Sequence, residues 1–154
     1  MPLYYVDSSA LVKAYVPEVG SEWVSALLTT DPAATSAVAV AEVASALARR
    51  TLEGKLTAEA RDIAYRQFLA DTRQHALVSS TQGVIREAAT LLLQTPSLPR
   101  LRTLDAIHIA SARSAFARAR RRGIATGAFV TADHTLAEAA SRAGLVVANP
   151  EDYP

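Results

Sequence analysis

The sequence predicts an α/β fold with a central parallel β-sheet of about four to five strands and helices on both faces. Short apolar segments alternate along the chain with longer segments of helical periodicity, and this alternation is typical of parallel strands joined by helices. The chain has 154 residues, of which half are apolar and one fifth are charged. This length and balance suit a single domain, so we expect residues 1–154 to share one core.

The first elements follow from apolar runs and helix breakers. Residues 3–6 are apolar and β-prone and predict a strand. A short helix should follow until Pro17, which cannot continue it. We expect Ser21 to cap the next helix, which runs to about residue 30. The Asp31-Pro32 pair then marks a turn before the next strand.

The middle of the chain predicts two helices between two strands. A short strand is expected at residues 33–36, followed by an alanine-rich helix at 37–53. Thr57 is placed to cap a second helix, at 57–73. Residues 75–78 then favour another strand.

The C-terminal half continues the alternation. Ser79, Ser80 or Thr81 should cap a helix that ends before Pro96 and Pro99. Gly123 is a natural end for the helix expected after Thr103. The remaining expected elements are helix 103–122, strand 127–132, helix 135–142 and strand 145–147.

Composition excludes several classes of protein. The absence of cysteine excludes disulfides, cysteine-ligated zinc and thiol nucleophiles. We find no signal-peptide pattern and no apolar run near the roughly 20 residues that span a bilayer. We therefore expect a cytoplasmic protein with no membrane partner. The net charge of +1 gives no general attraction to nucleic acid, although arginines cluster at positions 100, 102, 113, 118, 120, 121 and 122.

Two aspartates follow predicted strands directly. Asp7 comes after strand 3–6, and Asp133 comes at the end of strand 127–132. The rim at the carboxyl ends of parallel strands is where α/β sheets bind ligands. Either aspartate could instead be a helix N-cap, but Ser8 and Ser9 could cap the first helix equally well. The repeated pattern favours a site.

Two further carboxylates lie in apolar surroundings. Glu42 is in an alanine- and valine-rich helix, where a buried charge is costly unless it is paired or metal-bound. It could instead belong to a solvated stripe with Ser45 and Arg49. Asp105 is in the first turn of helix 103–122, where the helix dipole alone favours a carboxylate. Apolar neighbours such as Ile107 favour a role in a cleft.

Together, Asp7, Glu42, Asp105 and Asp133 would bind a hard cation. Like charges about 4 Å apart repel by about 4 kcal/mol at an effective dielectric near 20, so such a cluster takes up protons or a metal ion. Oxygen ligands select Mg²⁺ or Mn²⁺. Such ions can hold a phosphodiester and activate water for in-line attack on phosphorus.

Arginines and histidines are further candidates for a role in this chemistry. Arg113 and Arg118 are candidates to hold a nucleic-acid backbone, although arginines near the end of this helix are also favoured by its dipole. His108, one turn after Asp105, is placed to approach the cleft, but no histidine pair has zinc-site spacing. The sequence has neither a Gly-x-Ser-x-Gly motif nor a glycine-rich phosphate loop.

The motifs, in this order, resemble the PIN-domain ribonucleases, and among them the VapC-type toxins of bacterial toxin–antitoxin pairs. The matching segments cover essentially the whole chain. They are Tyr5-Val6-Asp7-Ser8-Ser9-Ala10-Leu11-Val12-Lys13, Glu42 in its apolar helix, Leu104-Asp105-Ala106-Ile107-His108-Ile109-Ala110, Val130-Thr131-Ala132-Asp133, and the closing Leu145-Val146-Val147-Ala148-Asn149-Pro150.

The resemblance implies a single PIN-like domain whose first and fourth strands are adjacent. It implies a metal site of the four carboxylates, supported by Ser9 and Thr131, with Mg²⁺ or Mn²⁺ as cofactor. It implies an RNA substrate, a homodimer and an antitoxin protein that blocks the site, and residues 37–69 are candidate surfaces for such partners. Some relatives have a further acidic residue near the last one; here His134 stands there, so one or two metal ions remain possible.

Two other functions stay open from sequence. A phosphorylated switch domain would need an early acidic pair and a lysine after its last strand, but the chain's lysines are Lys13 and Lys55. A non-catalytic RNA- or protein-binding PIN-like domain is the main alternative to a metal-dependent endoribonuclease.

Overall fold

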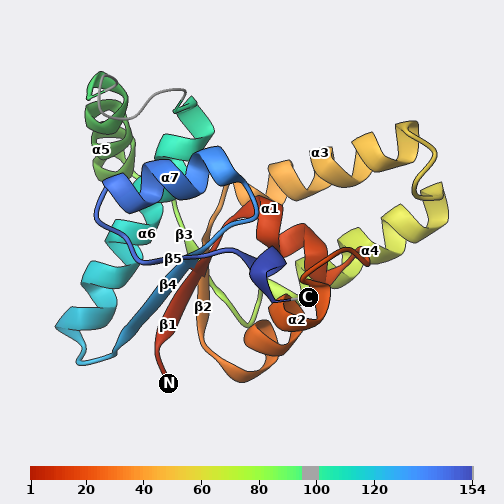
Figure 1. Ribbon diagram of the computed structural model, residues 1–154, viewed down its shortest axis with the longest axis horizontal. Coiled ribbons are helices and arrows are strands. Elements are labelled where there is room, and N and C mark those ends of the chain that lie inside the picture. Colours follow the sequence, from red (N-terminus) through yellow and green to blue (C-terminus); the bar gives the residue numbers. More distant parts are fainter. Residues whose placement is uncertain (95–100, 154) are drawn as a thin grey trace.

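The structure is a computed structural model that describes residues 1–94 and 101–153. Within the described residues, five parallel strands form one sheet in the order β3-β2-β1-β4-β5 (Figure 1). This confirms the predicted parallel sheet, including the neighbouring first and fourth strands. The strands are β1 Leu3–Val6, β2 Ala33–Ser36, β3 Ala76–Val78, β4 Thr126–Val130 and β5 Val147–Ala148.

Helices connect the strands and cover both faces of the sheet, as predicted. The α-helices are α1 Ser8–Leu11, α2 Ser21–Thr30, α3 Ala39–Leu52, α4 Ala58–Asp71, α5 Gln82–Leu93, α6 Thr103–Arg121 and α7 His134–Arg142. Short 3₁₀ turns lie at Val12–Ala14 and Pro150–Asp152. No described helix is long and apolar enough to cross a membrane.

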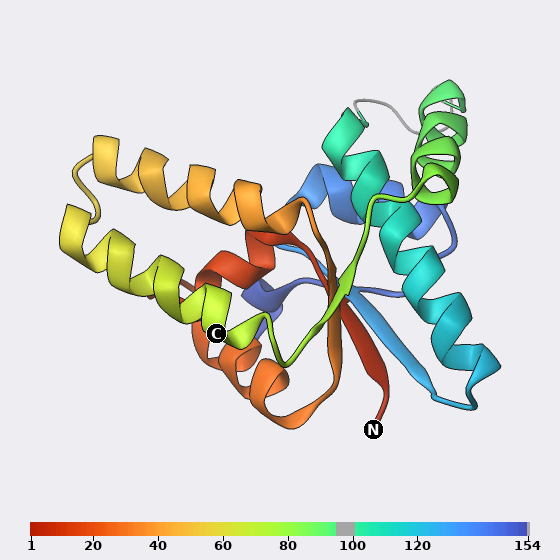
Figure 2. The ribbon, with the colours of Figure 1, turned by 180° about the vertical axis from the view of Figure 1, so that it is seen from behind.

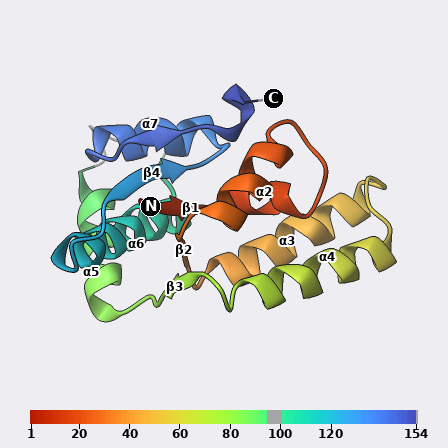
Figure 3. The ribbon, with the colours of Figure 1, turned by 90° about the horizontal axis from the view of Figure 1, so that it is seen from below.

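The alternation of side chains along the strands produces a core on each face. Tyr5 of β1 and Phe129 of β4 pack with α5, α6 and α7, whereas Val6 and Val130 pack with α1, α2, α3 and α4. The next residue along a strand points to the opposite face, which explains this division. Figure 3 shows the two groups of helices on opposite sides of the sheet.

The helices α3 and α4 form a hairpin that extends away from the sheet (Figures 1 and 2). Thr57 caps α4 by accepting a hydrogen bond from the amide of Ala60 (3.1 Å), as predicted. Thr81, one of three residues proposed to cap α5, accepts from the amide of Val84 (3.4 Å). This helix ends at Leu93, before Pro96 and Pro99, as predicted, and these two prolines fall outside the described residues.

One predicted cap is wrong. Gly20, not Ser21, is the N-cap of α2, and its φ of +84° is in the left-handed region. A Cβ atom at position 20 would lie 2.5 Å from the carbonyl oxygen of Pro150, so only glycine fits this turn. The Ser21 hydroxyl instead accepts from the amide of Glu18 (2.8 Å) and donates to the carbonyl of Val16 (3.3 Å). The other predicted boundaries agree with the structure to within a few residues.

Candidate active site

A cavity of about 680 Å³ opens where β1 and β4 end. The sheet and three helices bring the four predicted carboxylates to it: Asp7 follows β1, Glu42 is in α3, Asp105 is in the first turn of α6, and Asp133 lies between β4 and α7. The cavity is therefore at the carboxyl edge of the sheet, the usual position of ligand sites in α/β folds.

Asp7 is the most buried of these carboxylates, with 3% of its surface exposed. Its Oδ1 accepts from the amide of Ala10 (2.9 Å) and the hydroxyl of Ser9 (2.8 Å). Its Oδ2 accepts from the hydroxyl of Thr131 (2.7 Å). Burial raises the pKa of Asp7, although His108 and these hydrogen bonds oppose the rise. The side chain is thus both the N-cap of α1 and part of the cavity wall.

Ser9 and Thr131, the predicted supporting residues, join the ends of β1 and β4. The Ser9 hydroxyl lies 3.2 Å from the Thr131 hydroxyl and accepts from the amide of Ala132 (2.9 Å). The Thr131 hydroxyl also accepts from the amide of Asp133 (3.1 Å). These bonds fix the orientation of Asp7 and the path of the chain into Asp133.

Glu42 is held by two polar side chains. Its Oε2 accepts from the Ser8 hydroxyl (2.5 Å) and lies 2.6 Å from Nε2 of His108. Burial alone would raise the pKa of Glu42, but the hydrogen bonds from His108 and from the Ser8 hydroxyl lower it below the usual value. Glu42 is therefore ionised near neutral pH.

His108 is a site residue whose importance the sequence did not show. It is buried in α6, and its Nδ1 lies 2.8 Å from the hydroxyl of Tyr5. Burial raises the pKa of Tyr5 well above its usual value, so the hydroxyl stays neutral. We assign the tautomer in which the Tyr5 hydroxyl donates to Nδ1 and Nε2–H donates to Glu42. The available signal was a single histidine within an otherwise apolar stretch, one turn after Asp105.

Arg102 joins the other two carboxylates and was also missed as a site residue. Its Nε donates to Oδ2 of Asp105 (3.0 Å), and a terminal nitrogen donates to Oδ2 of Asp133 (3.2 Å). Asp105 also accepts from the backbone amide of Arg102 (3.2 Å). Asp133 caps α7 by accepting from the amide of Leu136 (3.0 Å).

The chemistry of these side chains fits a hard divalent cation. Oxygen donors from four elements line one cavity, and Mg²⁺ and Mn²⁺ prefer such donors. Among residues 1–94 and 101–153, no three acidic or histidine side chains already form a compact metal-binding group. The guanidinium of Arg102 is nevertheless held between two of the carboxylates, which shows that this part of the cavity accommodates a cation.

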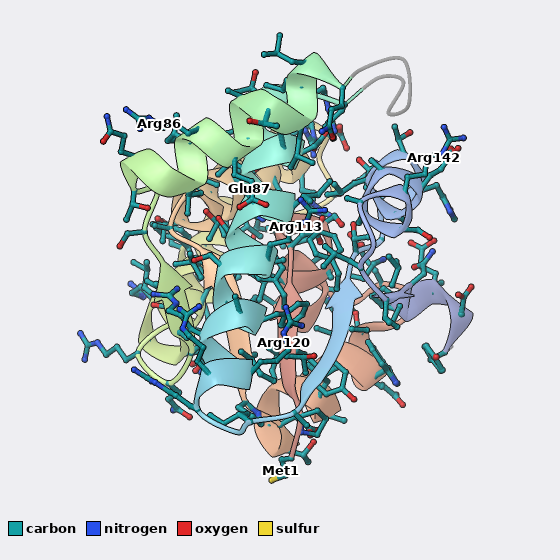
Figure 4. All side chains as sticks on the ribbon, turned by 90° about the vertical axis from the view of Figure 1, so that its left-hand side faces the viewer. Met1, Arg86, Glu87, Arg113, Arg120 and Arg142 are labelled. Carbon is teal, nitrogen blue, oxygen red and sulfur yellow. The ribbon has the colours of Figure 1, made fainter. Side chains whose placement is uncertain are left out.

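The two arginines predicted to bind substrate do not line this cavity. Arg113 donates to Glu87 (3.0 Å) and to the carbonyl of Ala143 (2.5 Å), and Figure 4 shows it beside Glu87 on the α5–α6 face. Arg118 is exposed farther along α6. The role of Arg113 and Arg118 in substrate binding stays a prediction, and their positions away from the cavity do not support it.

Other cations do reach the cavity wall. Arg49 and Arg50 approach it from α3, and Lys13 approaches it from the turn after α1. Lys13 is 4% exposed and pairs with Glu151 (2.9 Å) and Glu18 (3.3 Å). Arg50 also pairs with Glu18. This leaves Arg49 as an exposed cation on the same helix as Glu42.

Both the sequence and the fold of this chain were compared with those of known proteins. The PIN domain family matches residues 4–142. No curated protein sequence matches the chain significantly.

Two solved structures have a similar fold. One is VapBC2 from Rickettsia felis bound to a DNA fragment from their promoter, with a TM-score of 0.61, 13% identity, and coverage of 96% of this chain and 98% of that chain. The other is VapC20 from Mycobacterium tuberculosis, described as a Sarcin-Ricin loop cleaving toxin, with a TM-score of 0.61, 20% identity, and coverage of 93% and 96%.

Proposed function

Because this chain belongs to the PIN domain family, we propose that it is a Mg²⁺- or Mn²⁺-dependent endoribonuclease and the VapC-type toxin of a toxin–antitoxin pair. The observation that carries the proposal is the convergence of Asp7, Glu42, Asp105 and Asp133 on one cavity at the carboxyl edge of the sheet. The similar fold of a toxin described as cleaving the Sarcin-Ricin loop supports an RNA substrate.

The four carboxylates would hold the metal, with one or two ions bound. When present, such an ion polarises a phosphate and lowers the pKa of bound water. The protein's own residues determine the orientation of the ligands. Ser9 and Thr131 hold Asp7, and His108 holds Glu42. Hydrogen bonds of this kind commonly fix the orientation of metal ligands.

The partners in this proposal are an RNA substrate, an antitoxin protein and a second copy of the chain. The similarity to VapBC2 supports the antitoxin. The α3–α4 hairpin is the candidate surface for a partner helix or for dimerisation, because Leu52 is 90% exposed and Ile63 is 53% exposed there. A cytoplasmic location remains part of the proposal.

A non-catalytic RNA- or protein-binding PIN domain is the second candidate. One observation favours it: within the described part of the chain, Asp105 and Asp133 bind Arg102 and the acidic groups form no compact metal-binding group. This candidate predicts RNA binding that does not need a metal ion and is not followed by cleavage.

Cleavage of a mixed pool of tRNA, rRNA and mRNA by the purified protein distinguishes these functions. The reactions contain Mg²⁺, Mn²⁺ or a chelator. We expect discrete cuts with either metal, none with chelator, and none with Asp7→Asn. The exposed Asp152→Asn makes the same chemical change outside the cavity and should cleave like the wild type. Cleavage by Asp7→Asn at the wild-type rate would contradict the proposal, and metal-independent binding without cleavage would support the second candidate.

A further inference from the structure

Arg102 has an arrangement that the fold alone does not require. Its side chain is 72% exposed, yet its guanidinium contacts carboxylates from two separate elements, the first turn of α6 and the segment after β4. Its backbone amide already donates to Asp105 (3.2 Å) at the start of α6. This backbone bond does not use the guanidinium, and exposed ion pairs contribute little to stability.

The guanidinium occupies oxygen atoms of two carboxylates that belong to the proposed metal site. It donates to Oδ2 of Asp105 and Oδ2 of Asp133, and its charge also acts on Glu42. A divalent cation bound to these oxygens would displace the guanidinium, because the two cations repel each other at such short range.

A displaced Arg102 side chain would stay beside the site. Its backbone remains fixed by the bond to Asp105, and the side chain lines the same cavity as the four carboxylates. A guanidinium next to bound metal finds its best partner in an anion, and its planar donors match two phosphate oxygens at once.

We propose that Arg102 exchanges partners at the site: it neutralises Asp105 and Asp133 before metal binds, and it binds a phosphate of the RNA substrate afterwards. This inference rests on the proposed nuclease function. It makes Arg102, rather than the arginines later in α6, the phosphate-binding residue nearest to the site. It also makes the guanidinium a competitor of the metal ion.

The two roles predict opposite effects of one substitution. Arg102→Gln removes the competing charge, so we expect it to bind Mn²⁺ alone about 3- to 10-fold more tightly in isothermal titration calorimetry, given the screening of an exposed charge. The same variant should cleave RNA about 10- to 100-fold more slowly at saturating Mn²⁺, because it lacks the phosphate-binding group. A residue that only supported the fold would not tighten metal binding.

Two further variants serve as controls. Arg102→Lys keeps the charge but loses the planar fork, so its Mn²⁺ affinity should stay within about twofold of the wild type while cleavage still falls. Arg86→Gln makes the same charge change on the exposed face of α5 and should alter neither property.

The outcomes separate this inference from the proposed function. If the wild type binds Mn²⁺ and Arg102→Gln binds it no more tightly, the competition is refuted while the nuclease proposal stands. Tighter binding with undiminished cleavage would refute the phosphate contact. If neither protein binds Mn²⁺, both this inference and the metal-dependent function are contradicted.

Discussion

The hydrogen bond between Tyr5 and His108 allows a quantitative prediction about the support of the site. The Tyr5 hydroxyl lies 2.8 Å from Nδ1 of His108, and both side chains are almost completely buried. Tyr5→Phe removes this donor without changing the shape of the ring, so the stacking on Phe129 (centroids 5.3 Å apart) is retained. The substitution also removes the hydroxyl's interactions with Ser111 and the backbone of Ser36, so a His108 variant is needed to isolate the bond to His108.

The expected loss in the free energy of unfolding comes from the buried atom that no longer has a hydrogen-bond partner. A buried polar atom without its partner costs about 1–3 kcal/mol, and Nδ1 of His108 would become such an atom. Urea denaturation should show this loss in the free energy of unfolding. The melting temperature should fall by about 2–4 °C for each kcal/mol in a chain of this size.

Tyr4→Phe is the matched control on the neighbouring residue. No hydrogen bond of the Tyr4 hydroxyl is found within residues 1–94 and 101–153, so this variant should unfold within about 0.5 kcal/mol of the wild type. In a His108→Leu background, Tyr5→Phe should cost less than in the wild type, because the partner is already absent. A stability of Tyr5→Phe equal to that of Tyr4→Phe would refute the inferred network.

Three further predictions concern buried or paired charges. Because burial raises the pKa of Asp7 above 3.8, wild-type stability falls as pH rises through the folded-state pKa. Asp7→Asn should therefore melt at or above the wild-type temperature at pH 7, and the difference should be smaller at pH 4. A clearly lower melting temperature of this variant at pH 7 would contradict the prediction. The pKa of Glu42 is instead lowered from 4.5, so the charge of Glu42 stabilises the fold above that pH. Glu42→Gln should be less stable than the wild type at pH 7, and the difference in the free energy of unfolding should shrink below about pH 4.5. A difference that does not depend on pH would count against the pairing of Glu42 with His108. Lys13→Met should lower the free energy of unfolding by about 1–3 kcal/mol, because Glu18 and Glu151 lose a buried partner. Chemical denaturation that shows no change would exclude a stabilising role for these ion pairs.

The strand ends were predictable because local rules and the sheet agree there. For Asp7 and Asp133 the sequence posed a choice between helix capping and a site, but the structure shows that these roles coincide. Asp7 accepts from the amide of Ala10, Asp133 accepts from the amide of Leu136, and both line the cavity. The carboxyl end of a parallel strand is also the start of the next helix, so one side chain can serve both purposes.

The partners of the carboxylates could not be predicted in the same way. The bond from His108 to Glu42 joins residues 66 positions apart, and the bond from Arg102 to Asp133 spans 31 positions. The first contact depends on how α3 and α6 meet at the carboxyl edge of the sheet, and the second on how the start of α6 meets the segment after β4. No local pattern specifies either. In the sequence, His108 is distinguished only by its proximity to Asp105 in the helix, and Arg102 only as one of several clustered arginines.

Helix geometry explains why charge clustering alone was misleading for the substrate. Arg113 is eight residues after Asp105, which places it about 12 Å farther along the axis of α6 and on a different side of the helix. Its partners are Glu87 and Ala143 rather than the cavity. Arg102 precedes Asp105 by three residues and so lies beside the site. For the arginines in and before α6, position relative to the first turn of this helix, not arginine density, determines access to the cavity.

The most direct test of the central claim is the chemistry of the RNA ends produced by the wild-type protein. If the four carboxylates hold a divalent ion that activates water, water itself attacks phosphorus and the ribose 2′-hydroxyl takes no part. End-group analysis by mass spectrometry after cleavage with Mn²⁺ should then find linear phosphate monoesters and hydroxyl ends. Fragments that end in 2′,3′-cyclic phosphate, formed equally well in the presence of chelator, would contradict a carboxylate-bound metal centre.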